Sequence, residues 1–210
     1  MKKFKKVLVT LALGVLAACT AFTFAACSTT PDSSDEDNTT YDVVISDTAL
    51  KDVVGDGTLY VTSVGQADYS TATLLAKAAV GEGNYTADNK LAADAVADGD
   101  TVVIVIGMYS KGLGGAGTDQ ASEEARANAF AAKKDSINII ALHLGGEERR
   151  GTTSDPSIRT IAQAAKLVMV VKGGNNDGLF NTLCGETIPL YFYTIATNMQ
   201  SSLKFVLGGK

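Results

Sequence analysis

The sequence has no tryptophan, one histidine and three cysteines among 210 residues. With only seven tyrosines and seven phenylalanines, it offers few aromatic rings on which carbohydrate could stack. A single histidine and the lack of a cysteine cluster argue against a zinc site, which takes its ligands from these side chains. The formal net charge is −5 and no basic patch suited to nucleic acid is present, so nucleic acid is excluded as a partner. Composition alone identifies no cofactor.

Only one cysteine, Cys184, lies in the part of the chain expected to fold, so an internal disulfide is not possible. Cys184 follows Leu179, Phe180 and Leu183 at helical spacing. This pattern predicts a buried, inert thiol.

Residues 1–26 resemble the signal peptide of a lipoprotein. A basic segment, Met1–Lys6, precedes the uncharged run Val7–Ala26, and small residues come directly before Cys27. We expect Cys27 to be lipidated and to become the new N-terminus. The alternative is an uncleaved transmembrane helix in which Cys27 is simply an apolar residue, because about 20 apolar residues can span a bilayer.

Cys19 is a second candidate for lipidation. The residues Leu16-Ala17-Ala18 before it match the usual lipobox more closely, but Cys19 lies inside the apolar run, whereas a polar segment follows Cys27. The context therefore favours Cys27. Every version places the domain outside the cytoplasm, and the favoured one places it at the cell membrane as a lipid-anchored protein on the extracytoplasmic face.

Residues 27–40 are expected to form the lipidated cysteine and an acidic, disordered tether. The stretch 28–40 holds no aliphatic or aromatic residue and cannot bury enough apolar area to offset the entropy cost of ordering. The four lysines of residues 1–26 leave with the signal, so the mature chain is more acidic than the whole sequence. Residues 41–210 are long enough for a single domain with a full core.

Apolar runs alternate with helical patterns through this domain. Continuous apolar runs such as Thr101–Gly107 predict buried parallel strands, and Ile188–Tyr193 is expected to be the last strand. Tyr41–Ser46 reads as a short strand and Leu91–Val96 as a helix. The alternation predicts an α/β fold, a three-layer sandwich with a mainly parallel sheet that is flavodoxin-like or Rossmann-like. Strand order cannot be read from periodicity.

Four of the predicted strands, Leu59–Ser63, Thr101–Gly107, Ile137–Leu144 and Leu167–Val171, each run into a small polar loop. Ligands of open α/β sheets bind at the carboxyl ends of the strands, so the four loops predict one polar site. The candidate ligand-binding residues are Ser63, Gly65, Gln66, Ser110, Lys111, Gly112, Gly114, His143, Arg149, Arg150, Lys172, Asn175, Asn176 and Asp177.

The glycines of the second loop fit the pattern G-x-G-x-x-G over Gly112–Gly117. A dinucleotide fingerprint follows its strand almost at once and belongs to the first βα unit, which is not the case here. The loop can instead be a tight turn, or it can point backbone N–H groups at an anion with help from Ser110 and Lys111. Three more cations, Arg149, Arg150 and Lys172, follow other strand ends, so we expect an anionic ligand.

Catalysis is the alternative to binding. His143 near a strand end could activate Ser63 or Ser110, with Asp155 or Asp177 orienting the imidazole, as in a hydrolase or transferase. The nucleophile motif G-x-S-x-G is absent. Asp155 and Asp177 also suit the first position of a helix, so helix capping is the simpler role for both.

Metal binding is a further possibility for the third loop. His143, Glu147 and Glu148 could bind a divalent ion, but the alternating carboxylates of a calcium loop are missing. Arg149 and Arg150 can pair with these glutamates in solvent, or fork onto a carboxylate or phosphate of a ligand. We predict no metal site.

Four separated motifs, in the same order, resemble a family of bacterial secreted domains with no assigned function. They are Leu59–Ala67, Val105–Gly117, Ile140–Gly151 with Ser154-Asp155, and Val170–Gly178. The resemblance covers most of Thr58–Leu207. It implies an α/β fold and an exported protein, and it implies no activity.

The favoured hypothesis is an extracytoplasmic lipoprotein that binds a small molecule and serves a transporter or sensor. Its size counts against it, because receptors that close on a ligand usually have two lobes. The alternative is a small cell-surface hydrolase or transferase that uses the same crevice.

Overall fold

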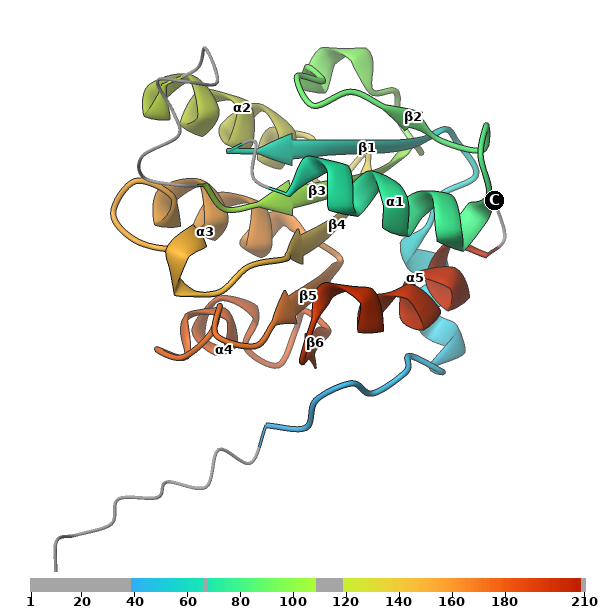
Figure 1. Ribbon diagram of the computed structural model, residues 1–210. Coiled ribbons are helices and arrows are strands. Elements are labelled where there is room, and N and C mark those ends of the chain that lie inside the picture. The colour runs from blue at the N-terminus through green and yellow to red at the C-terminus, as the bar shows by residue number, and fades with distance from the viewer. Residues whose placement is uncertain (1–38, 66–67, 109–118, 209–210) are drawn as a thin grey trace, which may run out of the picture. The chain divides into compact units, whose positions relative to one another are not determined.

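The computed structural model describes residues 39–65, 68–108 and 119–208, and six apolar runs among them form one parallel sheet (Figure 1). The order across the sheet is β2-β1-β3-β4-β5-β6, and every neighbouring pair is parallel. The strands are β1 (Leu59–Val64), β2 (Thr86–Ala87), β3 (Thr101–Ile106), β4 (Asn138–His143), β5 (Leu167–Val171) and β6 (Leu190–Tyr193).

This order decides between the two expected topologies. The first five strands have the flavodoxin-like order 2-1-3-4-5, and β6 is added beside β5. The direction of the winding reverses between β1 and β3. The predicted α/β fold with a parallel sheet is confirmed.

Helices cover both faces of the sheet (Figure 1). Helices α1 and α5 pack together on one face, whereas α2, α3 and α4 form a row on the other. The helices are α1 (Tyr69–Val80), α2 (Gln120–Ala132), α3 (Asp155–Ala164), α4 (Leu179–Cys184) and α5 (Gln200–Leu207). Four short 3-10 helices lie at Thr48–Val53, Ala93–Ala95, Glu147–Arg149 and Ala196–Met199. None of the helices in these described ranges is long and apolar enough to cross a membrane.

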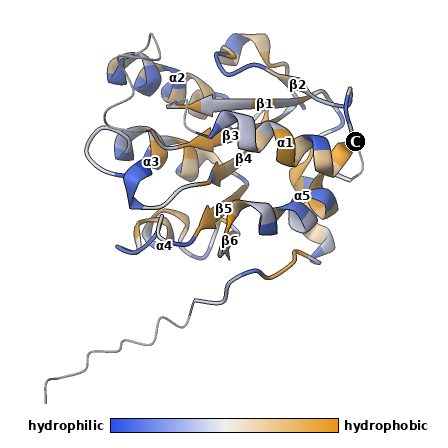
Figure 2. Ribbon diagram, in the orientation of Figure 1, coloured by the Kyte–Doolittle hydropathy of each residue, from blue (hydrophilic) through white to orange (hydrophobic). Residues whose placement is uncertain are grey.

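The central strands are buried on both faces, as their continuous apolar character predicts. Val103 and Val105 face α1 and α5, whereas Ile139 and Val170 face the opposite helix layer, and all four are buried. Cys184 is buried in that second layer, as expected, and burial raises the pKa of its thiol to about 11. In Figure 2 the hydrophobic colours of β4 and β5 give way to hydrophilic colours in the loops that follow them.

Two expected elements are not formed. Tyr41–Ser46 makes only an isolated bridge from Tyr41 to Phe192, because Asp42 adopts a left-handed conformation with φ of 59° and turns the chain away from β6. Leu91–Val96 is not a helix but encloses a single 3-10 turn. Its buried residues, Leu91, Ala93 and Val96, are two and three positions apart, which does not fit one helical face.

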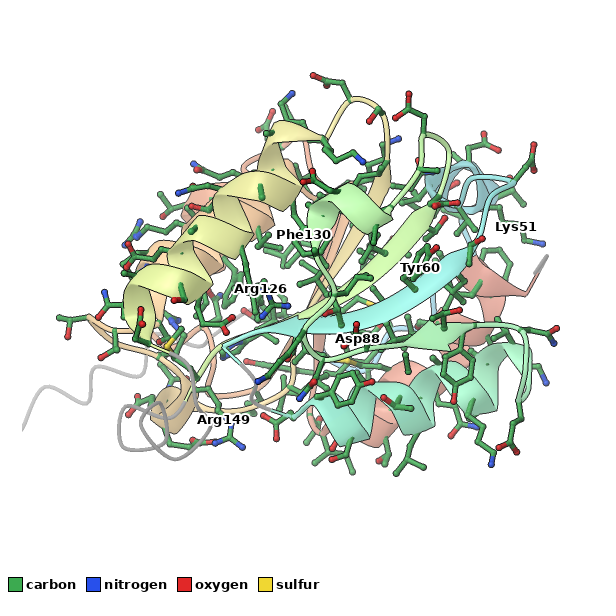
Figure 3. The ribbon with its side chains drawn as sticks, turned by 90° about the horizontal axis from the view of Figure 1, so that it is seen from above. Lys51, Tyr60, Asp88, Arg126, Phe130 and Arg149 are labelled. Atoms are coloured by element: carbon green, nitrogen blue, oxygen red, sulfur yellow. The ribbon has the colours of Figure 1, made fainter. Side chains whose placement is uncertain are left out.

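Two charged side chains of α2 connect that helix to β1 and to the crossover after β2. Arg126 points between β1 and α2 (Figure 3) and donates hydrogen bonds to the carbonyl oxygens of Asn89 and Leu91. Buried Glu123 accepts hydrogen bonds from the backbone N–H of Gly65, at 2.8 Å, and from Arg126, also at 2.8 Å. The backbone N–H of Gly65, at the end of β1, is therefore already bound by a carboxylate of the chain itself.

Candidate functional site

The loop after β4 carries two consecutive arginines that reach to opposite faces of the sheet. Arg149 forks onto Asp68 at the start of α1, with 2.6 Å from Nε to Oδ2 and 2.8 Å from Nη2 to Oδ1. Arg149 is buried, and Asp68 is held with φ of 57°, a left-handed conformation that Asp tolerates better than most residues. A fork of two charge-assisted hydrogen bonds fixes distance and orientation together, so it joins this loop to the β1–α1 connection.

Arg150 binds two carboxylates on the other side. Its Nε lies 2.9 Å from Oδ1 of Asp155, the first residue of α3, and its Nη2 lies 3.0 Å from Oδ2 of Asp177 in the β5–α4 loop. Nη1 also donates to the carbonyl oxygen of Gly174. Although partial burial works against both charges, these bonds keep the pKa of Arg150 above and that of Asp177 below the ordinary values.

A cavity of about 410 Å³ opens beside Arg150. It lies between the loops that follow β4 and β5, at the carboxyl edge of the sheet. A hydrogen bond links these loops, in which Nδ2 of Asn176 donates to Oε1 of Glu147 at 2.7 Å. The cavity is lined by Glu147, Arg150, Gly151, Asp155, Gly173, Asn176 and Asp177.

His143, the last residue of β4, lies fully buried below these loops. Its Nδ1 is 3.0 Å from the carbonyl oxygen of Ile106 and must donate, because a carbonyl can only accept. Nε2 is therefore an acceptor, and no donor among the described residues binds it. Burial lowers the pKa of His143 to about 4, so the ring is neutral at neutral pH.

Glycines leave the room that this ring needs. A Cβ on Gly174 would lie 2.3 Å from Cδ2 and 2.7 Å from Nε2 of His143. Gly107, at φ of 119°, passes on the other side, where an added Cβ would lie 3.1 Å from Cε1. The ring of Phe180 is 5.2 Å from the imidazole between centroids. His143 is thus enclosed by backbone and aromatic surface.

Ser63 and His143 lie on opposite faces of the sheet. Ser63 is in register with Val105, which faces α1 and α5, whereas His143 is in register with Val170, which faces the other layer. Successive side chains of a strand alternate between the two faces of the sheet. Whether Ser63 and His143 share a face therefore depends on the register of the strands, which the sequence does not reveal. Ser63 cannot act as a nucleophile activated by His143.

The structure brings together only some of the predicted site residues. Arg150, Asn176 and Asp177 line the cavity, whereas Gly65, Ser63, His143 and Arg149 are buried. The amide of Asn175 serves α4, where its Oδ1 accepts the Phe180 N–H at 2.8 Å, and Lys172 lies over the ring of Tyr41. The predictions for Gln66, Ser110, Lys111, Gly112 and Gly114 fall outside the described residues.

Asp68, Asp155 and Glu147 take part in this arrangement but were not among the candidate ligand-binding residues. Asp155 was expected to cap α3, but its carboxylate binds Arg150 and accepts the backbone N–H of Gly151 at 3.0 Å instead. An aspartate at the junction of a loop and a helix looks like a cap in any sequence. The available signal was that several carboxylates also follow the strand ends, where they can pair with the cations.

No three His, Cys, Asp or Glu side chains within residues 39–65, 68–108 and 119–208 are placed to hold a metal ion together. The carboxylate of Glu148 accepts the backbone N–H of Gly146 at 3.1 Å. Buried His143 meets backbone and the Phe180 ring instead of a carboxylate.

The family model for a domain of unknown function, DUF6305, matches residues 56–207. The chain belongs to the DUF6305 family. The match spans the sheet from just before β1 to the end of α5, so the two arginines and the cavity lie within the family domain. No curated protein and no solved structure shows significant similarity to the chain.

In this DUF6305 domain, replacing Asp68 with Asn should test the Arg149 fork, because Asn tolerates the left-handed backbone but carries no charge. We expect Asp68→Asn to lower the free energy of unfolding by about 2 kcal/mol, as for a hydrogen bond to a charged group. Arg149→Lys should cost a similar amount, and the double variant should cost less than the sum of the two. Urea denaturation measures all three, and exposed Asp98→Asn is the control, expected within about 0.5 kcal/mol. Additive effects would show that the two residues are not coupled.

His143 should make the domain less stable in mild acid. Its pKa is about 4 in the folded state and near 6.5 when unfolded, so the unfolded chain takes up the proton first as the pH falls. The free energy of unfolding that depends on a neutral His143 is fully present above pH 6.5 and is lost as the pH falls towards 4. Relative to His143→Asn, whose amide can still donate to Ile106, the wild-type protein should lose about 3 kcal/mol of unfolding free energy between pH 7.5 and pH 4. Parallel pH profiles of the two proteins would contradict this.

Proposed function

We propose that this DUF6305 protein is an extracytoplasmic lipoprotein whose domain binds a small polar ligand in the cavity between the loops after β4 and β5. The observation that carries the proposal is the cavity itself. It lies at the carboxyl edge of a parallel sheet, where such folds bind ligands, and its volume is typical of small-molecule sites. Its walls come from two loops that Arg150 holds in place by bonds to Asp155 and Asp177.

The charges around the cavity bear on the class of ligand. The sequence led us to expect an anion, because cations follow several strand ends. Arg149 and Arg150 are both paired with carboxylates of the chain, and Lys172 lies over Tyr41. Three carboxylates and one guanidinium among the lining residues leave two net negative charges. These charges favour a ligand that donates hydrogen bonds through ammonium, guanidinium, amide or hydroxyl groups.

The hydrolase or transferase alternative has less support. It needs a nucleophile that His143 can activate, and Ser63 lies across the sheet from that ring. His143 is also fully buried and enclosed by Gly174 and Phe180. A binding protein that passes its ligand to a transporter or sensor in the membrane needs neither an activated serine nor an exposed histidine.

The lipid anchor should depend on one cysteine. Cys27→Ser should abolish labelling of the protein with a radioactive or clickable fatty acid, because serine lacks the sulfur atom to which the lipid is attached. Cys19→Ser is the matched control and should be labelled as the wild-type protein is. Loss of labelling in Cys19→Ser alone would move the cleavage site to Cys19, and labelling of both variants would refute the lipoprotein proposal.

The charge of exposed Glu147 should decide ligand affinity. In a thermal-shift screen of amines, amino acids, polyols and phosphorylated acids, a ligand at 100 times its dissociation constant should raise the melting temperature by roughly 5–10 °C. Glu147→Gln keeps an oxygen for Asn176 and removes one negative charge, so it should weaken stabilisation by a cationic ligand. Exposed Glu186→Gln is the control. Hits confined to phosphorylated acids, strengthened by Glu147→Gln, would restore the anionic ligand expected from the sequence.

A further inference from the structure

Exposed apolar side chains gather at one place on the described surface. Four large hydrophobic residues are clearly exposed among the described residues. Three of them, Val43 at 44%, Val44 at 53% and Ile195 at 54%, lie near the end of β6. The fourth, Leu74, lies on α1. Single exposed hydrophobic residues are ordinary, but three in one place indicate a surface that contacts something apolar.

The apolar surface formed by Val43, Val44 and Ile195 is held together by Asp42. Asp42 donates its backbone N–H to the carbonyl oxygen of Phe192 at 2.9 Å, and its Oδ1 accepts the backbone N–H of Thr194 at 2.8 Å. Val43 and Ile195 directly follow the two bonded residues, Asp42 and Thr194. The surface is therefore a fixed part of the domain, where the N-terminal segment meets the end of β6.

An aromatic ring and a cation lie next to this surface. Tyr41 packs edge-to-face on Phe192, with 6.2 Å between ring centroids, and the Nζ of Lys172 lies 5.2 Å from the centroid of the Tyr41 ring. Aliphatic, tyrosine and lysine side chains together are the composition that proteins present to the interface of a bilayer.

We propose that the surface of Val43, Val44 and Ile195 rests on the lipid bilayer and orients the domain on the membrane. The inference depends on the lipid anchor at Cys27 proposed above. Residues 28–40 are thirteen residues between that anchor and Tyr41, so the apolar surface cannot be more than about 45 Å from the lipid. The chain thus joins the domain where three of the four exposed large hydrophobic residues of the described part lie.

The apolar surface alone is too small to hold a soluble protein on a membrane. A tether of this length changes that, because it converts contact with the bilayer into an intramolecular event at an effective concentration near millimolar. Weak contacts between the apolar surface and the bilayer can then determine the orientation of the anchored domain on the membrane. Tyr41 and Asp42 already cover the edge of β6, so a second copy of the chain could not add a strand there. This favours lipid as the partner of the apolar surface.

This orientation would place the ligand cavity close to the membrane. Lys172, beside Tyr41, begins the same β5–α4 loop that supplies Gly173, Asn176 and Asp177 to the cavity. Ligand would then enter and leave near the lipid surface, within reach of a transporter or sensor in the membrane.

The test uses the full-length, lipidated protein reconstituted in vesicles of phosphatidylethanolamine and phosphatidylglycerol. Val44→Cys and Ile195→Cys carry an environment-sensitive fluorophore, and Leu74→Cys, at an exposed apolar position of α1, is the matched control. We expect a blue-shifted emission and at least twofold stronger quenching by brominated lipid at positions 44 and 195 than at position 74. The buried thiol of Cys184 should stay unlabelled in folded protein.

The outcomes separate the two proposals. If the protein floats with the vesicles and all three probes report water, the anchor stands and the membrane-facing surface is wrong. If the wild-type protein carries no lipid and does not float, the lipoprotein proposal itself fails and this inference falls with it. Equal quenching at the three positions would show that the anchored domain tumbles without a preferred face, which also overturns the inference.

Discussion

The arrangement of the carboxyl edge depends on two adjacent arginines that point in opposite directions. Arg149 joins the loop after β4 to the start of α1, and Arg150 joins the same loop to α3 and to the loop after β5. These loops share no strand ladder, so side chains must hold them together. A guanidinium fork suits this role because it sets both distance and angle, and because partial burial makes an unpaired charge costly.

The same pairing also sets the charge at the carboxyl edge of the sheet. Ligands of doubly wound folds usually bind where the strand order reverses, which in this domain is between β1 and β3. There the carboxylate of Glu123 already accepts the amide of Gly65. The cavity lies instead beyond β4 and β5, among carboxylates that have one guanidinium between them. Among the described residues, the chain's own acid therefore binds the Gly65 amide at the reversal point, and the cavity lies to one side of it.

Much of this fold follows from the sequence because apolar runs and helical spacing report burial directly. The runs around Val103, Ile139 and Val170 identify the central strands, and their continuous apolar character identifies a parallel sheet. The site was less predictable because pairing across loops leaves no local pattern. Nothing near Arg149 in the sequence points to Asp68, which is 81 positions away, and nothing reveals that Ser63 and His143 face opposite layers. Likewise, the spacing of apolar residues around Leu91 predicts a helix. Only the structure shows that Leu91, Ala93 and Val96 are the buried residues, which does not fit one helical face.

The number of residues between the end of β4 and the two arginines is fixed by their partners. A deletion of one residue between His143 and Arg149 would bring Arg150 opposite Asp68 and Gly151 opposite Asp155 and Asp177. Asp155 and Asp177 would then lose the guanidinium that pairs with them. Deleting one residue here would therefore lower the stability of the domain more than most single substitutions do. Descendants of this domain can therefore vary the chemistry of the cavity by substitution, but this loop should resist insertions and deletions as the family diverges.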